Sequence, residues 1–286
     1  MDLPLVVGVD GSEPSLRAVD WAADEAVRRG YALRAVYASL WERYEGAAPG
    51  HGTTATRPRG EEVLDAALRR AGARQPDLKA TAEIVPEEPE YVLIREARQA
   101  AAVVVGTRGH GGFAGALLGS VSVTVAAHAH CPVVVVRGDT AAPADGRVVV
   151  GVGDGAETAA TVHYAVESAR ARGTSVEAVR AWRRPSREPG GHPPLPGGTA
   201  DPAHEEQAAR RLDEALRDAP PDVELLRRTV EGHARRALVD ASYDAELVVV
   251  GARRRGGRFG LQLGRVAHAV LHHAACPVAV VPQRVA

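Results

Sequence analysis

The feature that most constrains the fold of this chain is an internal duplication. Sliding the sequence against itself aligns a glycine-rich stretch that begins at Gly106 with another that begins at Gly251, and it also aligns two Cys-Pro pairs. A slightly shorter shift, which places Gly30 on Gly173, aligns LVVGVD, near the N-terminus, with VVVGVG. Because the chain has 286 residues, each copy is as long as an ordinary domain. The duplication therefore predicts two domains, residues 1–138 and residues 145–286.

Each copy alternates between short apolar runs, which are typical of buried strands, and longer segments with helical periodicity. Ser12 is a candidate N-cap of the first helix, and Gly30 marks its expected end. Alternation with short connections predicts the α/β class, with two tandem doubly wound parallel-sheet domains. In the first copy we expect strands at residues 3–9, 31–38, 79–85, 100–106 and 132–136, and helices at 12–30, 61–72, 90–99 and about 120–130.

The composition is that of a soluble globular protein, and it excludes several classes of function. A formal net charge of -1 gives the whole molecule no attraction to nucleic acid or to an anionic membrane. The apolar runs are far shorter than the roughly 18 residues that a membrane span needs. Lys79 is the only lysine, which excludes a P-loop because that motif requires a lysine after its second glycine. We expect a cytoplasmic protein with neither nucleic acid nor membrane as partner.

Two loops are candidates for a ligand site, because ligands of open α/β sheets bind beyond the carboxyl ends of the strands, where the strand order reverses. The loop after the first strand contains Asp10, Gly11 and Ser12, and the loop after the fourth strand begins at Gly106. Glycines let backbone N–H groups approach phosphate closely, and a helix N-terminus adds a favourable partial charge. The alternative is that these glycines only form tight turns over a packed sheet.

The glycines fit a longer motif. Gly106-x-x-Gly109, nine further residues and then Gly119-Ser120 match the pattern G-2x-G-9x-G(S/T). With this motif, the VDGS loop and the segment HAHCPVVVV, the chain resembles the ATP-binding branch of the universal stress protein family over both copies. The resemblance implies two Rossmann-like domains, similar to adenine nucleotide hydrolases, each with a five-stranded parallel sheet of order 3-2-1-4-5. It also implies that the final strands of the copies pair, which would make the chain an intramolecular pseudo-dimer.

The resemblance further assigns residues to ATP, with or without Mg²⁺. Asp10 would meet the ribose, with Gly11 and Ser12 beside it, and the backbone near Val36 would meet the adenine. The residues assigned to the phosphates and to the helix start that holds them are Gly106, Arg108, Gly109, Gly119, Ser120, Val121 and Ser122. The first copy is therefore the expected ATP-binding domain.

The second copy departs from this pattern at three of the assigned contacts. Gly109 is replaced by Arg254, Ser120 by Arg265 and Asp10 by Gly153, with an acid one residue later at Asp154. One interpretation is a degenerate copy with a structural role, because these changes remove a hydroxyl and fill the space of a phosphate. The other interpretation is a different anion site, because arginine side chains suit phosphates and carboxylates.

Two weaker patterns point to other cofactors. Gly151-x-Gly153-x-x-Ala156 follows an expected strand as a dinucleotide-binding fingerprint would, but its acidic partner, Glu177, falls near the beginning of the next strand rather than at its end. His268 and His272 are spaced to share a helix face with Cys276 nearby, as metal ligands can be, but histidines at a helix end also favour the helix dipole. We expect neither a nicotinamide cofactor nor a metal site.

The sequence contains no arrangement typical of a catalytic site, such as GxSxG or HExxH. The function implied by the resemblance is that of a nucleotide-dependent regulator or sensor in stress response, and not of a fast enzyme. Two alternatives stay open, namely a slow ATPase and a structural stress protein that binds no nucleotide. Further homodimerisation of whole chains also stays open.

Overall fold

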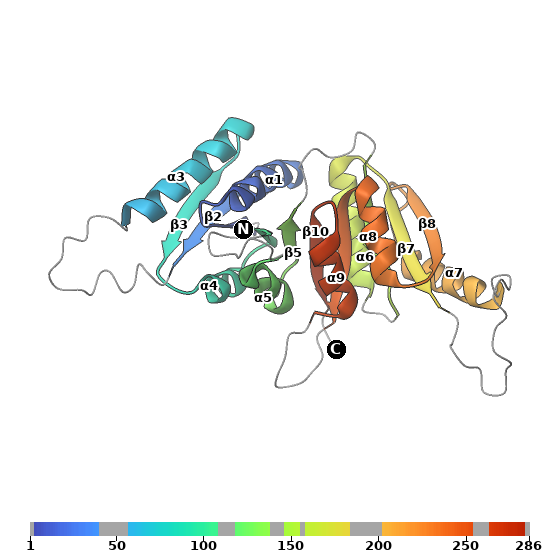
Figure 1. The fold of residues 1–286 in the computed structure, drawn as a ribbon. Coiled ribbons are helices and arrows are strands. Elements are labelled where there is room, and N and C mark those ends of the chain that lie inside the picture. The colour runs from blue at the N-terminus through green and yellow to red at the C-terminus, as the bar shows by residue number, and fades with distance from the viewer. Residues whose placement is uncertain are drawn as a thin grey trace.

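The computed structural model describes residues 3–39, 57–107, 118–137, 146–154, 158–183, 202–253 and 263–283. Two similar series of strands and helices follow one another along the chain (Figure 1). The first half contains β1 (Leu5–Val9), α1 (Glu13–Arg29), β2 (Leu33–Ala38), α3 (Arg57–Arg74), β3 (Ala80–Val85), α4 (Pro89–Glu96), β4 (Ala102–Gly106), α5 (Ser120–His128) and β5 (Val133–Val136). The second half contains β6 (Arg147–Gly151), α6 (Thr158–Arg172), β7 (Val176–Trp182), α7 (Pro202–Leu216), β8 (Leu225–Glu231), α8 (Ala234–Ala241), the 3₁₀ turn η1 (Ser242–Asp244), β9 (Ala245–Arg253), α9 (Arg265–His273) and β10 (Val278–Gln283).

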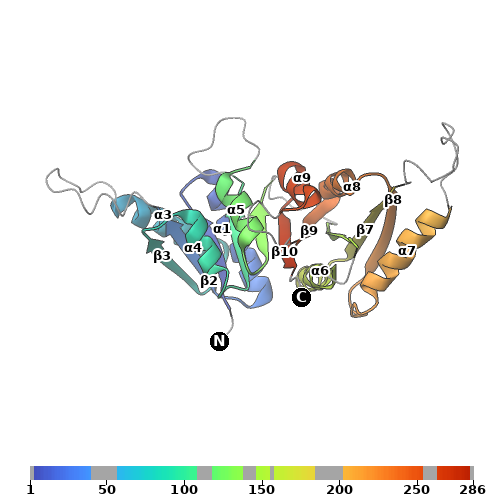
Figure 2. The ribbon, with the colours of Figure 1, turned by 90° about the horizontal axis from the view of Figure 1, so that it is seen from below.

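The ten strands of the described residues belong to one sheet, with the order β3-β2-β1-β4-β5-β10-β9-β6-β7-β8. Each half therefore has the predicted order 3-2-1-4-5, and the strands within each half are parallel. The two halves meet where β5 and β10 pair antiparallel, with Val133 opposite Val280 (Figure 2). This pairing removes the exposed edge that each final strand would otherwise present. The predicted α/β class is confirmed, and the pairing of the final strands joins both halves into one mixed sheet.

Helices cover both faces of the sheet, and consecutive residues of each central strand face different helices. In β1, Leu5 and Val7 pack in the cluster that includes residues of α1 and α3, whereas Val6 packs with residues of α4 and α5. A strand buried on both faces needs a continuous apolar sequence, which explains the valine runs. Both clusters contain residues from the two halves. The hydrophobic core is thus continuous across the junction.

The ends of α1 follow from local sequence signals. Ser12 is the N-cap, and its side chain accepts a hydrogen bond from the Ser15 amide. Gly30 ends the helix in the left-handed region, with φ 70°, after two arginines in the last turn. Gly173 has an equivalent φ of 66° after α6. The predicted helix boundaries are confirmed here, because caps depend on residues adjacent in sequence.

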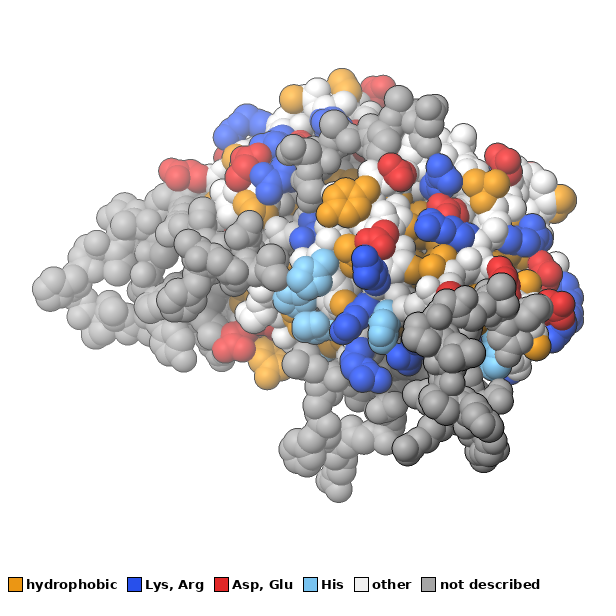
Figure 3. Space-filling model, turned by 45° about the vertical axis from the view of Figure 1, so that its right-hand side comes forward, with side chains coloured by type: hydrophobic (Ala, Val, Ile, Leu, Met, Phe, Trp, Pro, Cys, Tyr) orange, Lys and Arg blue, Asp and Glu red, His pale blue; other side chains and the backbone are white. Residues whose placement is uncertain are grey.

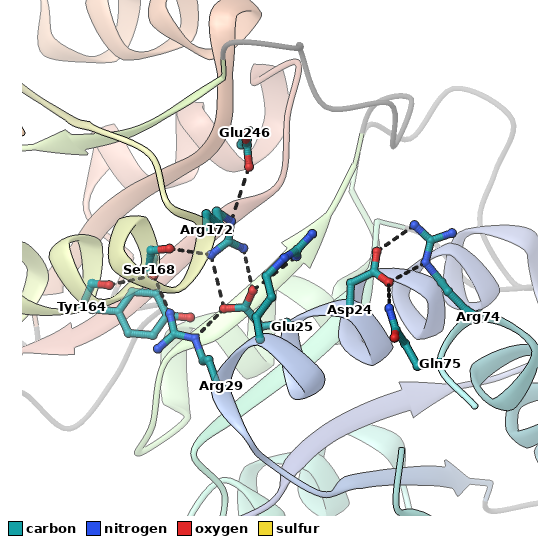
Figure 4. Close-up of polar contacts among 10 residues, drawn as sticks. Asp24, Glu25, Arg29, Arg74, Gln75, Tyr164, Ser168, Arg172 and Glu246 are labelled. Atoms are coloured by element: carbon teal, nitrogen blue, oxygen red, sulfur yellow. Dashed lines mark hydrogen bonds and ion pairs between the residues drawn. The ribbon is translucent and has the colours of Figure 1, made fainter. Parts of the chain in front are cut away.

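Helices α1 and α6 meet at the junction through charged side chains that have little exposure (Figure 4). The Glu25 side chain is only 1% exposed, and its carboxylate pairs with Arg172 Nη2 at 2.7 Å and with Arg29 Nε at 2.5 Å. Arg29 Nη2 also donates to Ser168 Oγ at 2.6 Å, and Arg172 Nη1 donates to the Ser168 carbonyl at 3.0 Å. Glu246 Oε2 lies 3.7 Å from Arg172 Nε. Each buried charge in this cluster therefore has an opposite charge beside it.

The same junction has the reciprocal contacts of a two-fold interface. The guanidinium of Arg29 lies 5.1 Å from the centre of the Tyr164 ring, and that of Arg172 lies 5.6 Å from the centre of the Trp21 ring. The shift that places Gly30 on Gly173 also aligns Arg29 with Arg172 and Trp21 with Tyr164. In a symmetric dimer, residue i of one copy contacts residue j of the other and the reverse. The duplicated chain forms this arrangement within itself.

Both cysteines are free thiols, buried just before β5 and β10. Burial raises the pKa of Cys131 and of Cys276 to about 12. Since the thiolate is the reactive form, we expect native protein near neutral pH to be alkylated by iodoacetamide much more slowly than unfolded chain. Counting alkylated thiols by mass spectrometry, with and without urea, checks this. Fast native alkylation of either thiol would contradict it.

No helix of the described ranges is long and apolar enough to cross a membrane. The sequence also predicts a polar connection between the copies, from Arg137 to Arg147, and a Pro/Gly-rich loop, from Arg183 to Pro202. Residues 138–145 of the connection and residues 184–201 of the loop lie outside the described residues.

Candidate functional site

The candidate site lies at the carboxyl ends of β1 and β4. Strand β1 pairs in parallel with β2 on one side and with β4 on the other. The chain thus leaves β1 in one direction for β2 and β3, and it forms β4 and β5 on the opposite side. This reversal of strand order is where the loops diverge and open sheets bind ligands. The loops that follow β1 and β4 are the two that the sequence analysis selected.

Gly106 brings these two loops together. A Cβ atom at this position would lie 2.6 Å from the carbonyl carbon and oxygen of Pro14 and 2.9 Å from the Ser15 amide nitrogen. Such distances are far inside van der Waals contact, and the obstructing atoms are backbone atoms. Only glycine therefore fits where the end of β4 crosses the first turn of α1. The sequence analysis assigned Gly106 to the phosphates, a role that the structure does not test, and the contact seen here is with the first turn of α1.

The β1–α1 loop fixes its own acidic side chain. Asp10 Oδ1 accepts hydrogen bonds from the Ser12 amide at 3.0 Å and from Ser12 Oγ at 2.6 Å. Gly11, between them, has φ 84°, a conformation that favours glycine. Ser15 Oγ donates to the Ser12 carbonyl at 2.8 Å. The half-buried carboxylate of Asp10 is consequently held at the carboxyl end of β1 before any ligand arrives.

The start of α5 is attached to the end of β4. The Gly119 amide donates to the Thr107 carbonyl at 2.7 Å, and Ser122 Oγ donates to the Gly106 carbonyl at 2.7 Å. Ser122 is 4% exposed, whereas Ser120, the first residue of α5, is exposed. Ser120 is therefore the exposed serine of this helix start, and its Oγ lies 3.5 Å from Glu90 Oε1. The hydrogen bonds of Gly119 and Ser122, which flank Ser120, place the positive end of the α5 helix dipole beside the carboxyl end of β4.

Four other residues were predicted to contact the nucleotide, and the structure describes two of them. The backbone of Val36 lies inside the sheet, opposite Gly8 of β1 and Glu83 of β3, and its side chain is 1% exposed. Arg108 and Gly109 lie outside the described residues, and their predicted roles are untested. Val121 is half-buried in the first turn of α5.

The second half has the same framework with different side chains. Gly153 and Asp154 follow β6, and Arg265, which is exposed, begins α9 after Gly264. Arg254 lies outside the described residues. Arg180 of β7, which the sequence analysis did not select, reaches the β6–α6 loop and bonds to the Gly153 carbonyl at 2.8 Å. The shift that places Gly30 on Gly173 aligns Arg180 with Tyr37. This difference between the two copies is the sequence signal from which Arg180 could have been selected.

Two partly exposed arginines elsewhere in the second half pair with acidic side chains. Arg170 Nε lies 2.7 Å from Asp222 Oδ2, and Arg227 Nε lies 2.8 Å from Asp213 Oδ1. On the side of the molecule drawn in Figure 3, acidic and basic side chains are mixed over much of the surface, and basic and histidine side chains gather near the centre of the view.

The structure also bears on the two weaker patterns. Glu177 lies near the amino end of β7, where its carboxylate oxygens lie 3.4 Å from Arg147 Nη1 and 3.2 Å from Arg228 Nη1. That end of the strand is opposite to the candidate site. The His268 and His272 rings lie 4.3 Å apart between centres, yet no group of three or more metal-ligating side chains occurs in the part of the chain that the structure describes.

Comparison with known proteins identifies the family. The model of the universal stress protein family matches residues 3–137 and 146–282. The chain belongs to the universal stress protein family. A universal stress protein of Mycobacterium bovis is 32% identical over 315 residues, covering 99% of this chain and 96% of its own length. One from Mycobacterium tuberculosis is 32% identical over 294 residues, covering 97% and 96%.

One solved structure agrees with the fold of the whole chain. A universal stress protein from Archaeoglobus fulgidus aligns over 98% of both chains with a TM-score of 0.74 and 17% identity. Another universal stress protein from that organism, solved in complex with dAMP, aligns with 48% of this chain at 26% identity and a TM-score of 0.36. The first of these structures therefore shares the fold of this chain over nearly its whole length.

Proposed function

We propose that the first half binds ATP, with or without Mg²⁺, and that the protein is a nucleotide-dependent regulator or sensor in stress response. The observation that carries this proposal is the close approach of Gly106 to the first turn of α1. This approach brings the oriented carboxylate of Asp10 and the N-terminus of α5 to the same edge of the sheet. We assign the two domains to residues 1–138 and 145–286, and the family matches support that division.

Each part of the site suits a different part of a nucleotide. The carboxylate of Asp10, oriented by Ser12, is an acceptor for ribose hydroxyls. The N-terminus of α5 offers backbone N–H groups and a positive dipole end to phosphate, with the Ser120 hydroxyl beside them. Gly109 and Arg108, from the motif, complete the phosphate loop in this proposal. Adenine would lie toward β2, near Val36.

Substitutions at Ser120 test the phosphate contact. Ser120→Glu places a negative charge where phosphate would lie. The stabilising effect of an acid in the first turn of a helix offsets its repulsion by Glu90, whose Oε1 lies 3.5 Å from Ser120 Oγ. We expect this variant to fold normally and to bind ATP at least about tenfold more weakly by calorimetry. Ser120→Thr keeps the hydroxyl and is the matched control, with affinity near that of the wild type. Equal ATP affinity of all three proteins would contradict the assigned contact.

The number of nucleotides per chain tests the function as a whole. Protein purified without added nucleotide is denatured, and released adenine nucleotide is quantified by chromatography. If none is released, calorimetry with saturating ATP decides. One ATP per chain supports the proposal, whereas no binding even with added ATP favours a structural stress protein.

Slow ATP hydrolysis is the second candidate, and one contact favours it. Glu90 Oε1 lies 3.5 Å from Ser120 Oγ, so a carboxylate is within reach of the helix start. A carboxylate there is able to orient a water molecule toward a bound phosphate. Phosphate release above the buffer background that disappears in Glu90→Gln supports the ATPase. ATP binding without such release leaves the regulator.

A further inference from the structure

The corner between β6 and β7 differs from its counterpart in the first half by one buried side chain. The pairing registers are equivalent, since Gly8 lies opposite Val36 in the first half and Gly151 lies opposite Val179 in the second. The next residue is Tyr37 in β2 and Arg180 in β7. Tyr37 packs in the hydrophobic core, whereas Arg180 brings a positive charge to the same place.

Arg180 bonds to the loop that corresponds to the Asp10 loop. Its Nη1 donates to the Gly153 carbonyl at 2.8 Å and lies 3.5 Å from the Val152 carbonyl. Its Nη2 lies 2.5 Å from Asp154 Oδ1. The repeat alignment that pairs Arg180 with Tyr37 also pairs Gly153 with Asp10 and Asp154 with Gly11. The guanidinium therefore lies against the loop where, in the first half, ribose is proposed to bind.

The two halves stabilise this loop in different ways. In the first half, Asp10 and Ser12 bond to each other, and the carboxylate stays at the strand end. Gly153 has no side chain for this purpose, and Arg180 satisfies the loop carbonyls from the neighbouring strand instead. Arg180 is only 9% exposed, whereas the Asp154 side chain is 69% exposed. A ligand at this corner would have to displace a buried, paired charge, which is costly.

We propose that Arg180 closes the second half's counterpart of the nucleotide site, so that the chain binds one nucleotide. This inference rests on the proposed function of the first half. It adds a fourth difference to the three seen in the sequence, and it acts where the nucleoside would bind rather than at the phosphates. In this proposal, the Arg180 guanidinium is sufficient to keep nucleotide out of the second half, even without the three other differences.

The test uses the full chain in a background that restores the first half's residues at three positions. These substitutions are Gly153→Asp, Arg254→Gly and Arg265→Ser. Among the described residues, the nearest neighbour of a Cβ at Gly153 would be Thr158 Oγ1 at 4.0 Å, so a side chain can begin there without a close contact at its Cβ. The background is compared with the same chain carrying Arg180→Tyr, the first half's residue, and ATP per chain is measured by calorimetry. Arg227→Tyr, an exposed arginine on the adjacent strand β8, is the matched control.

We expect about one ATP per chain in the background and in the control, and about two after Arg180→Tyr. Two ATP in the background with Arg180 intact would overturn the inference. One ATP in a folded Arg180→Tyr chain would also overturn it. Arg180→Met, which removes the guanidinium but keeps an unbranched side chain, is the second variant if the tyrosine chain fails to fold, and it must also give two. No ATP in the wild type would instead reject the proposed function.

Discussion

Glu25→Gln should lower the free energy of unfolding by about 3 kcal/mol, the lower end of the range for removing one partner of a buried ion pair. Glu25 is the acidic side chain between Arg29 and Arg172, both of which have little exposure. Glutamine has almost the same shape, so the loss comes from charge rather than packing. Arg172 retains Glu246 at 3.7 Å, and Arg29 retains Ser168, which limits the loss.

Urea denaturation followed by circular dichroism measures this effect. Asp24→Asn is the matched control, because it removes a carboxylate from the adjacent position of the same helix. Asp24 pairs with Arg74 at 2.7 Å, within the first half, and the Arg74 side chain is 45% exposed (Figure 4). Such partly exposed pairs contribute about 1 kcal/mol or less. Equal losses from Glu25→Gln and Asp24→Asn would show that the buried cluster does not stabilise the junction.

Gly106→Ala should both destabilise the fold and weaken ATP binding. The added methyl group meets the backbone of Pro14 at 2.6 Å, so β4 and the first turn of α1 must separate. Overpacking of this kind costs about 1–3 kcal/mol. Because the displaced turn follows directly on the Asp10 loop, we expect a loss of ATP affinity of at least about tenfold, as for one good hydrogen bond to a charged group.

Gly72→Ala separates this effect from a general intolerance of alanine at glycine positions. Gly72 lies in α3, and a Cβ there has no neighbour within 4 Å among the residues that the structure describes. Alanine in a helix is favoured over glycine by about 0.5–1 kcal/mol, so this variant should be as stable as the wild type or more so. ATP affinity should be unchanged. A Gly106→Ala protein with wild-type stability and affinity would contradict the assigned role of Gly106.

The sequence by itself determined the architecture of each half. The repeat, the alternation of strands and helices and the family resemblance predicted the order 3-2-1-4-5, which the sheet has. Ser12 and Gly30 were identified as the ends of α1, because a cap depends on a few adjacent residues. The loops after β1 and β4 were also selected from the sequence, because the predicted strand order brings both loops to the same edge of the sheet.

Only the tertiary structure decided which side chains meet across the fold. Arg29 of α1 contacts Ser168 of α6, and Arg172 at the end of α6 contacts Glu25 of α1. Ser122, which the sequence analysis placed with the phosphates, donates its hydroxyl to the Gly106 carbonyl. The sequence analysis did not distinguish Arg180 from the other arginines. The register of β6 and β7 places its side chain against the Gly153 carbonyl. Periodicity and caps are short-range patterns, whereas a buried polar side chain takes its partner from whatever segment the packed fold places beside it.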